Sequence, residues 1–187
     1  MEPKIQATIE DAAEHPEHGR PDEVAIFDYI YGVLHCVAYR ETYAEFLKID
    51  FPRVPYPSSP EVFWDISAKG SALRKLHLME GIDAGTAYPF KGEAPEEGSG
   101  FVEIIGKKSF VLTDENKGNV LLNETQYFQD VPKTAWEFYI GGYQPAQKWL
   151  KDRKTRTLSF DDCMHYRNII HILMETDRIM KTIEMDL

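Results

Sequence analysis

Five basic side chains lie close together in a chain that is otherwise acidic. Between Gly141 and Phe160 the only acidic residue is Asp152, whereas the whole chain of 187 residues carries a formal net charge of −10 at pH 7. Such a local reversal of charge predicts a surface that meets an anion, and a polyanion such as DNA before a small one. The five basic residues are Lys148, Lys151, Arg153, Lys154 and Arg156.

Amide and aromatic side chains accompany these charges. Gln144 and Gln147 can make paired hydrogen bonds to the edge of adenine, and Tyr143 or Trp149 can pack on a sugar or an unstacked base. The same residues also have a structural interpretation. Trp149 follows Pro145 by four residues and suits a helix facing the core, while the lysines around it suit the solvated face of that helix.

Further candidates for contact with DNA lie outside this segment. One candidate lies in an extended segment that is punctuated by Pro52, Pro55, Pro57 and Pro60. Arg53 projects from this segment and can reach a phosphate, although a simple salt bridge explains its presence equally well. Turns between short strands supply the others, and solvated turns use the same residue types. These candidates are Arg53, Lys107, Lys108, Asn116 and Lys117.

Signatures of catalysis are missing from the sequence. It has no G-x-x-x-x-G-K-[ST] loop, no G-x-G-x-x-G turn and no consecutive Pro-Pro. Asp22 combined with Glu115-Asn116-Lys117 or with Asp152-Arg153-Lys154 loosely matches a nuclease site. Such a site needs the acidic residue and the lysine on a buried strand, whereas Glu115 is expected in a turn and Asp152 on an exposed helix. His15 and His18 are separated by Pro16 and have no further ligand nearby, so we expect no metal site. The chain alone is therefore expected not to be an enzyme.

Helices are expected at both ends of the chain. Residues 1–20 are polar and predict a flexible arm or linker, followed by a helical region over 21–80. There, apolar residues spaced by three and four predict a helix from Asp22 to Leu47, and Ser59 with Pro60 predicts the start of a second helix that ends near Gly81. The region 132–187 is again helical, with a capping box at Ser159 and Asp162.

Short strands are expected between these helical regions. Residues 81–100 are rich in Gly, Pro and Glu and predict a loop. Three β-branched or aromatic runs then predict an antiparallel meander over 101–128, with a tight turn at Lys117 and Gly118. The predicted fold class is α+β, with helices flanking a small antiparallel β-meander.

Composition agrees with a folded protein of the cytoplasm. The chain is 43% hydrophobic, and its length suits one substantial core or two small ones. Its two cysteines, Cys36 and Cys163, lie in apolar segments typical of reduced, buried thiols. No apolar run is long enough to predict a membrane span or a signal peptide, so we expect a cytoplasmic protein.

Three aromatic-rich blocks occur in a defined order along the chain. They are FDYIYGVLHCVAYRETYAEFLKIDFPRVPYP from Phe27 to Pro57, LLNETQYFQDVP from Leu121 to Pro132, and WEFYIGGYQPAQKWLKDRKTRTLSFDD from Trp136 to Asp162. In this order they resemble the C-terminal target-recognition (specificity) domain of Type ISP restriction-modification enzymes and the related C-terminal regions of large adenine-specific DNA methyltransferases.

The resemblance implies a domain, here residues 21–187, that recognises a short sequence of double-stranded DNA and presents it to a preceding methyltransferase domain. It implies S-adenosylmethionine for the parent enzyme, no cofactor in this chain, and helicase or nuclease domains as further neighbours in the polypeptide. No family motif assigns base contacts to positions in this sequence. The alternative is a scaffolding domain whose acidic faces dock onto the methyltransferase or motor of the same enzyme.

Overall fold

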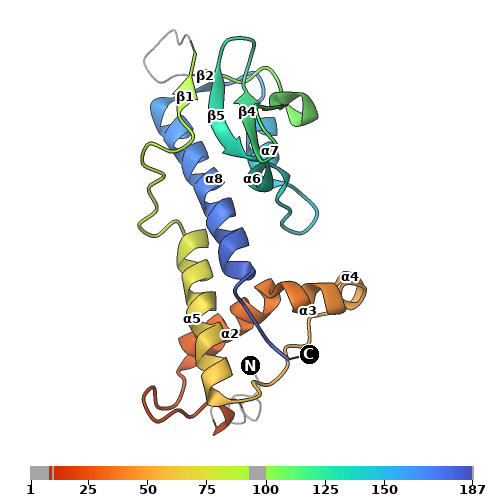
Figure 1. Cartoon of the computed structure of the whole chain (residues 1–187), viewed down its shortest axis with the longest axis vertical. Helices are drawn as coiled ribbons and strands as arrows, with labels where there is room; N and C mark the ends of the chain where they lie inside the picture. The colour runs from red at the N-terminus through yellow and green to blue at the C-terminus, as the bar shows by residue number, and fades with distance from the viewer. Residues whose placement is uncertain (1–8, 10, 93–99, 187) are drawn as a thin grey trace. The chain divides into compact units, whose positions relative to one another are not determined.

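The computed structural model describes residues 9, 11–92 and 100–186, and these form helices together with two small antiparallel sheets (Figure 1). The expected α+β class is confirmed. The chain divides into two compact units. Unit 1 comprises Met1–Glu80 and Thr176–Leu187, and unit 2 comprises Gly81–Glu175. No helix of the described ranges is both long and apolar enough to cross a membrane.

Unit 1 is built on the helices α2 (Glu23–His35) and α5 (Pro60–His77). Each begins at a side-chain cap, since Asp22 accepts a hydrogen bond from the Ala25 amide at 2.7 Å and Ser59 accepts one from the Val62 amide at 3.3 Å. The predicted start of α5 at Pro60 is confirmed. Their shared core is formed by Ile26, Tyr29, Val33, Phe63, Ile66 and Leu73.

A glycine allows the two helices to approach closely. A Cβ atom on Gly70 would lie 1.8 Å from the carbonyl oxygen of Asp28, so no other residue can occupy this position without moving the helices apart. The close approach also places Asp28, which is buried, against Arg74. The guanidinium donates two hydrogen bonds to this carboxylate, at 2.6 and 3.0 Å. Burial of Asp28 is thus compensated by a bidentate ion pair.

The first helix is shorter than its apolar spacing predicts. It ends at Cys36, whose backbone is extended, and the chain continues in α3 (Val37–Thr42) and α4 (Phe46–Ile49). Tertiary contacts explain the break: the Cys36 thiol lies 3.6 Å from the Ile183 carbonyl oxygen, and the Tyr39 hydroxyl donates to the Arg53 carbonyl oxygen at 3.0 Å. The prediction of one helix to Leu47 was wrong because these contacts are not visible in helical periodicity.

A histidine connects the end of α5 to the returning C-terminal segment within unit 1. His77 contacts the Tyr31 hydroxyl through Nδ1 at 2.7 Å and the Thr176 hydroxyl through Nε2 at 2.8 Å. Burial, and then the neighbouring His35, lowers the pKa of His77 from its ordinary value to about 4. The imidazole is therefore neutral near pH 7.

The segment before α2 packs against α5 within unit 1. Ala13 is buried, and the indole of Trp64 donates to its carbonyl oxygen at 3.0 Å. Arg20 forms an ion pair with Asp11 at 3.0 Å. Residues 11–20, which the sequence predicted to be part of an arm or linker, thus lie against α5, while residues 1–8 and 10 lie outside the described ranges.

Unit 2 contains a four-stranded antiparallel sheet in the order β1-β5-β4-β3. These strands are β1 (Phe90–Lys91), β5 (Tyr127–Pro132), β4 (Lys117–Leu121) and β3 (Phe110–Leu112). A second sheet pairs β2 (Gly100–Phe101) with β6 (Thr157–Leu158). The run from Phe101 to Gly106 was predicted to be a strand of the meander, but only Phe101 belongs to a strand.

The hairpin between β3 and β4 turns earlier than predicted. Asp114 accepts hydrogen bonds from the amides of Asn116 and Lys117, at 2.8 and 3.0 Å, and so closes the turn before β4 begins. Lys117 and Gly118 belong to β4 rather than to the turn. The predicted turn was wrong because Gly118 serves close packing instead: a Cβ there would lie 2.4 Å from the Val111 carbonyl oxygen.

Three helices pack on this sheet within unit 2: α6 (Lys133–Glu137), α7 (Pro145–Lys151) and the first part of α8 (Phe160–Met180). The predicted capping box is confirmed, with Ser159 N donating to Asp162 at 3.0 Å and Asp162 N donating to Ser159 Oγ at 3.1 Å. Cys163 lies in this core, where burial raises the pKa of its thiol to about 12. Both cysteines are buried and free.

Candidate nucleic-acid interface

One cavity in unit 2 brings together several candidates that the sequence places on α7 and just before it. It has a volume of about 370 Å³ and is lined by Ile105, Gly106, Tyr143, Gln144, Gln147, Lys148 and Lys151. Residues separated by three and four lie on one side of a helix, so the lining positions from Gln144 to Lys151 form one face. We call this surface, together with Tyr143, the α7 face.

The two glutamines of the α7 face are held by the backbone around α6. The side-chain nitrogen of Gln147 donates to the Trp136 carbonyl oxygen at 3.1 Å, and that of Gln144 donates to the Glu137 carbonyl oxygen at 3.3 Å. Each amide retains its oxygen as an acceptor and one N–H as a donor. The remaining acceptor and donor of each amide can still bind the edge of adenine, and the hydrogen bond to the backbone fixes the orientation of the amide.

Tyr143 supplies an exposed ring beside these amides. Its backbone N–H and carbonyl pair with Ile140 across a short turn in which Gly141 has a φ of 59°. The side chain is 51% exposed. Tyr143 can therefore contact a ligand, because it is exposed and lines the same cavity as the two glutamines.

Trp149, on the opposite side of α7, has a different role. Its ring lies 5.1 Å from that of Tyr166 and 5.9 Å from that of His165, measured between centroids, and it packs against the core of unit 2. The guanidinium carbon of Arg153 lies 3.7 Å from the Trp149 centroid, and Arg153 also donates to the Trp149 carbonyl oxygen at 3.2 Å. The structure supports the core interpretation of Trp149, and it shows Arg153 stacked on this ring.

The remaining basic side chains of the segment differ in their partners. Lys148 forms an ion pair with Asp152, the residue that follows the end of α7. The side chains of Lys151, Lys154 and Arg156 are exposed and make no hydrogen bond or ion pair with any described residue. Among these five positions, the last three thus carry the charge that is available to phosphate.

Lys107 and Lys108 lie near the α7 face. They occupy the short 3-10 helix η1 (Gly106–Ser109), both are exposed, and Gly106 before them lines the cavity. The sequence predicted them at a hairpin tip, which was wrong because residues 102–105 are not a strand. Ile105 and Gly106 were not predicted as site residues at all, although Gly106, with a φ of 71°, precedes the two lysines directly.

Asn116 and Lys117 lie in acidic surroundings. The Lys117 amine contacts Asp130 at 3.1 Å and Asp114 at 3.8 Å, and these hydrogen bonds and charges raise its pKa. A cavity at this hairpin also includes Glu115. These surroundings oppose phosphate binding. The lining of this cavity also shares no residue with the cavity at the α7 face.

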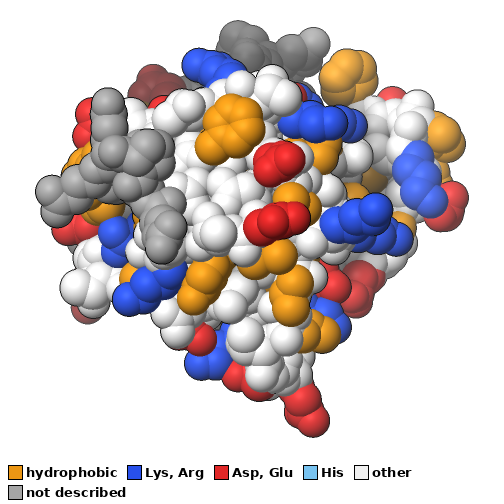
Figure 2. Space-filling view, turned by 90° about the horizontal axis from the view of Figure 1, so that it is seen from above, with side chains coloured by type: hydrophobic (Ala, Val, Ile, Leu, Met, Phe, Trp, Pro, Cys, Tyr) orange, Lys and Arg blue, Asp and Glu red, His pale blue; other side chains and the backbone are white. Residues whose placement is uncertain are grey.

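Arg53 belongs to unit 1, where its guanidinium is exposed and lies 4.0 Å from Asp50. Unit 1 contains ten Lys and Arg residues against seventeen Asp and Glu residues, a net charge of −7, while unit 2 contains eleven against fourteen, a net charge of −3. The face shown in Figure 2 carries Lys and Arg side chains interspersed with acidic and hydrophobic ones. Both units are therefore acidic overall, and on this face basic side chains do not form one continuous patch.

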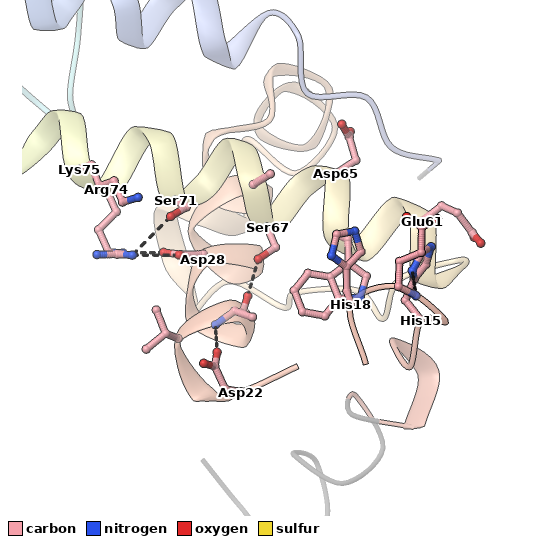
Figure 3. Close-up of a pocket in the computed structure, with 15 residues that line it drawn as sticks. His15, His18, Asp22, Asp28, Glu61, Asp65, Ser67, Ser71, Arg74 and Lys75 are labelled. Atoms are coloured by element: carbon pink, nitrogen blue, oxygen red, sulfur yellow. Dashed lines mark hydrogen bonds and ion pairs between the residues drawn. The ribbon is translucent and has the colours of Figure 1, made fainter. Parts of the chain in front are cut away.

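A cavity of about 660 Å³ in unit 1 offers a contrasting environment (Figure 3). His15 and His18 lie side by side there, with ring centroids 4.8 Å apart. A hydrogen bond with Ser59 lowers the pKa of the Glu61 carboxyl, which also lines this cavity. Arg74 points at Asp28, which binds it. Glu17, Asp22 and Asp65 add further acidic groups to the lining. This cavity is unsuited to a polyanion, and the described residues contain no group of three side chains that could hold a metal ion.

Comparison with known proteins shows a shared fold. The chain is 20% identical to the Type ISP restriction-modification enzyme LlaGI, solved as a nuclease-deletion mutant in complex with a DNA substrate mimic, with a TM-score of 0.60 over 87% of this chain and 14% of that chain. It is 23% identical to DrdV, solved in complex with DNA, with a TM-score of 0.68 over 89% of this chain and 18% of that chain.

A shorter match connects the sequence to an enzyme of another kind. The O-methyltransferase gedA of Aspergillus terreus is 28% identical over 75 residues, which cover 40% of this chain and 15% of that protein. This match covers too little of either protein to indicate a family. The chain spans less than a fifth of the length of each of these three proteins.

The match to a family model covers nearly all of the sequence. The model described as the Type ISP C-terminal specificity domain matches residues 2–182, which include the described parts of both units up to the end of α8. The resemblance inferred from the three aromatic-rich blocks is thereby confirmed. The chain belongs to the family of Type ISP C-terminal specificity domains.

Proposed function

We propose that this chain recognises a short sequence of double-stranded DNA as the specificity domain of a longer restriction-modification enzyme. The main observation behind it is the α7 face, where an exposed aromatic ring, two oriented amides and the unpaired Lys151 occur together, with the exposed Lys154 and Arg156 following in the chain. Membership of the specificity-domain family supports it, as do the DNA complexes in which LlaGI and DrdV were solved.

The three kinds of side chain have distinct roles in this proposal. Lys151, Lys154 and Arg156 contact phosphates and position the domain, because such contacts carry most of the affinity but no sequence information. Gln144 and Gln147 read base edges, each with one acceptor and one remaining donor. Tyr143 packs on a sugar or on an exposed base. Lys107 and Lys108 add phosphate contacts from η1.

In this proposal the chain carries out no chemical step and binds no cofactor of its own. Methyl transfer with S-adenosylmethionine, DNA cleavage and movement along DNA belong to the methyltransferase, nuclease and motor parts of the parent polypeptide. Those parts act where bacterial DNA is found, so the proposed location is the cytoplasm.

Photochemical crosslinking tests where DNA binds. A duplex substituted with iodouracil is irradiated with the purified chain, and the crosslinked residues are identified by mass spectrometry. We expect crosslinks at Tyr143, because this exposed ring lies next to the proposed base-reading amides. Crosslinks confined to the acidic cavity or to other parts of unit 1 would contradict the assignment to the α7 face.

A further inference from the structure

Four large apolar side chains are exposed on one segment of unit 1. They are Phe46, Ile49, Phe51 and Tyr56, with exposed fractions of 67, 82, 91 and 54%. They follow α3, and in Figure 1 α3 and α4 lead away from the α2–α5 pair. We call residues 46–56 the apolar arm. Single exposed apolar residues are common on proteins, whereas four large ones on one short segment indicate an interaction surface.

The apolar arm is held in place by specific contacts. The buried Tyr39 donates its hydroxyl to the Arg53 carbonyl oxygen at 3.0 Å, and Tyr29 donates to the Pro55 carbonyl oxygen at 2.9 Å. Proline at positions 52, 55 and 57 stiffens the chain around these anchors. The exposure of the arm is thus a consequence of the fold.

The arm also borders a preformed cavity. Its volume is about 250 Å³, and the aromatic residues in its lining are Tyr39, Tyr43, Phe46 and Phe51. A cavity with aromatic walls and one charged pair, Asp50 and Arg53, at its edge accepts an apolar side chain of a partner. Anchors of this kind contribute much of the binding energy at protein interfaces.

Charge and area restrict what can cover the arm. Unit 1 carries a net charge of −7, which repels DNA and also a second copy of itself. Four such side chains expose roughly 500 Å² of apolar surface, given the area that aromatic residues bury. This is less than the ~800 Å² per partner of a standard stable interface, so the arm alone is too small for a free partner.

We propose that the apolar arm docks onto the polypeptide that precedes the specificity domain in the same enzyme and receives an apolar side chain from it. The matched structures support such a partner, because this chain corresponds to only 14 and 18% of their length. A covalent connection raises the effective concentration of the partner to the order of millimolar, so a small patch is sufficient. The facing surface is neutral or basic. This proposal does not depend on how the α7 face reads DNA.

Hydrogen exchange of the backbone amides tests the docking. The exchange of residues 43–51 is compared between the isolated chain and the full-length polypeptide that carries it. We expect slower exchange by at least tenfold in the full-length protein, because a docked surface opens less often. Equal exchange would overturn the proposal. Dimerisation of the isolated chain that is lost in Phe51→Asp would also overturn it, since a second copy would then be the partner.

A double variant, Phe46→Asp with Phe51→Asp, separates this proposal from DNA recognition. In the full-length polypeptide we expect it to abolish the protection, whereas the control Leu78→Asp, at another exposed apolar residue of unit 1, keeps it. In the isolated chain the double variant keeps its circular dichroism spectrum and its DNA affinity to within twofold. Loss of DNA binding by the folded, isolated variant would place the arm in the DNA surface and refute the docking.

Discussion

Replacing Lys151, Lys154 and Arg156 together by alanine removes three exposed cations whose side chains make no hydrogen bond or ion pair with any described residue. If each neutralises one phosphate, the slope of log K against log salt becomes less steep by about 2.7, at about 0.9 per contact. The same relation gives about 1 kcal/mol per contact at ~0.15 M salt. The triple variant is therefore expected to bind duplex DNA roughly 100-fold more weakly.

Fluorescence anisotropy with a labelled duplex at several salt concentrations measures both quantities. A matched control replaces Lys48, Lys75 and Lys181 by alanine, which removes the same charge from unit 1. A second control is Lys148→Ala, for which we expect a slope change well below one contact because Asp152 already pairs with this lysine. Circular dichroism verifies that each variant is folded.

Two results would refute the reasoning about these cations. One is a folded triple variant whose slope equals that of the original chain, because none of the three side chains would then contact phosphate. The other is an equal loss of affinity in the unit 1 control. Net charge alone would then explain the effect, and the α7 face would have no special role.

Other consequences concern the stability and reactivity of the folded chain. The pKa of His77 is about 4 in the folded chain and near its ordinary value in the unfolded chain, so the unfolded chain takes up this proton first as the pH decreases. Stability measured by urea unfolding is therefore expected to fall as the pH decreases from about 6.5 toward 4. His77→Gln makes this decrease smaller, and the same pH profile in the variant would contradict the assignment to His77. Gly70→Ala is expected to destabilise the chain by about 3 kcal/mol or more because its Cβ meets the Asp28 backbone, whereas Gly142→Ala, which meets nothing within 4 Å, changes the unfolding midpoint little. The thiol of Cys163 stays unalkylated by iodoacetamide in the native chain and reacts after denaturation, since burial disfavours its thiolate; rapid native labelling detected by mass spectrometry would contradict this.

Local signals in the sequence predicted several structural features correctly. Ser59 with Pro60 and Ser159 with Asp162 act through hydrogen bonds to neighbours only three residues away, so their effect can be read directly from the sequence. The break at Cys36 depends on Ile183 and on the segment around Arg53, which are distant in sequence. Helical periodicity contains no information about such contacts.

The candidate site shows the same limit. The sequence predicted a local cluster of basic and amide side chains around a helix that starts at Pro145, and the structure places Gln144, Gln147 and Lys151 of this cluster in the lining of one cavity. It could not predict that Lys148 is paired with Asp152 or that Arg153 stacks on Trp149. Charge counts treat these lysines and arginines alike, whereas their side-chain partners determine which of them can bind phosphate.

Selection from a pool of random duplexes tests whether this chain reads a DNA sequence. The purified chain is incubated with the pool, bound DNA is sequenced after several rounds, and the affinity of the recovered sequences is compared with that of scrambled ones. We expect enrichment of one short motif. The double variant Gln144→Ala with Gln147→Ala relaxes this preference, while its binding still depends on salt. Binding without any enriched motif, or no binding at all, would contradict the claim that this chain reads a DNA sequence.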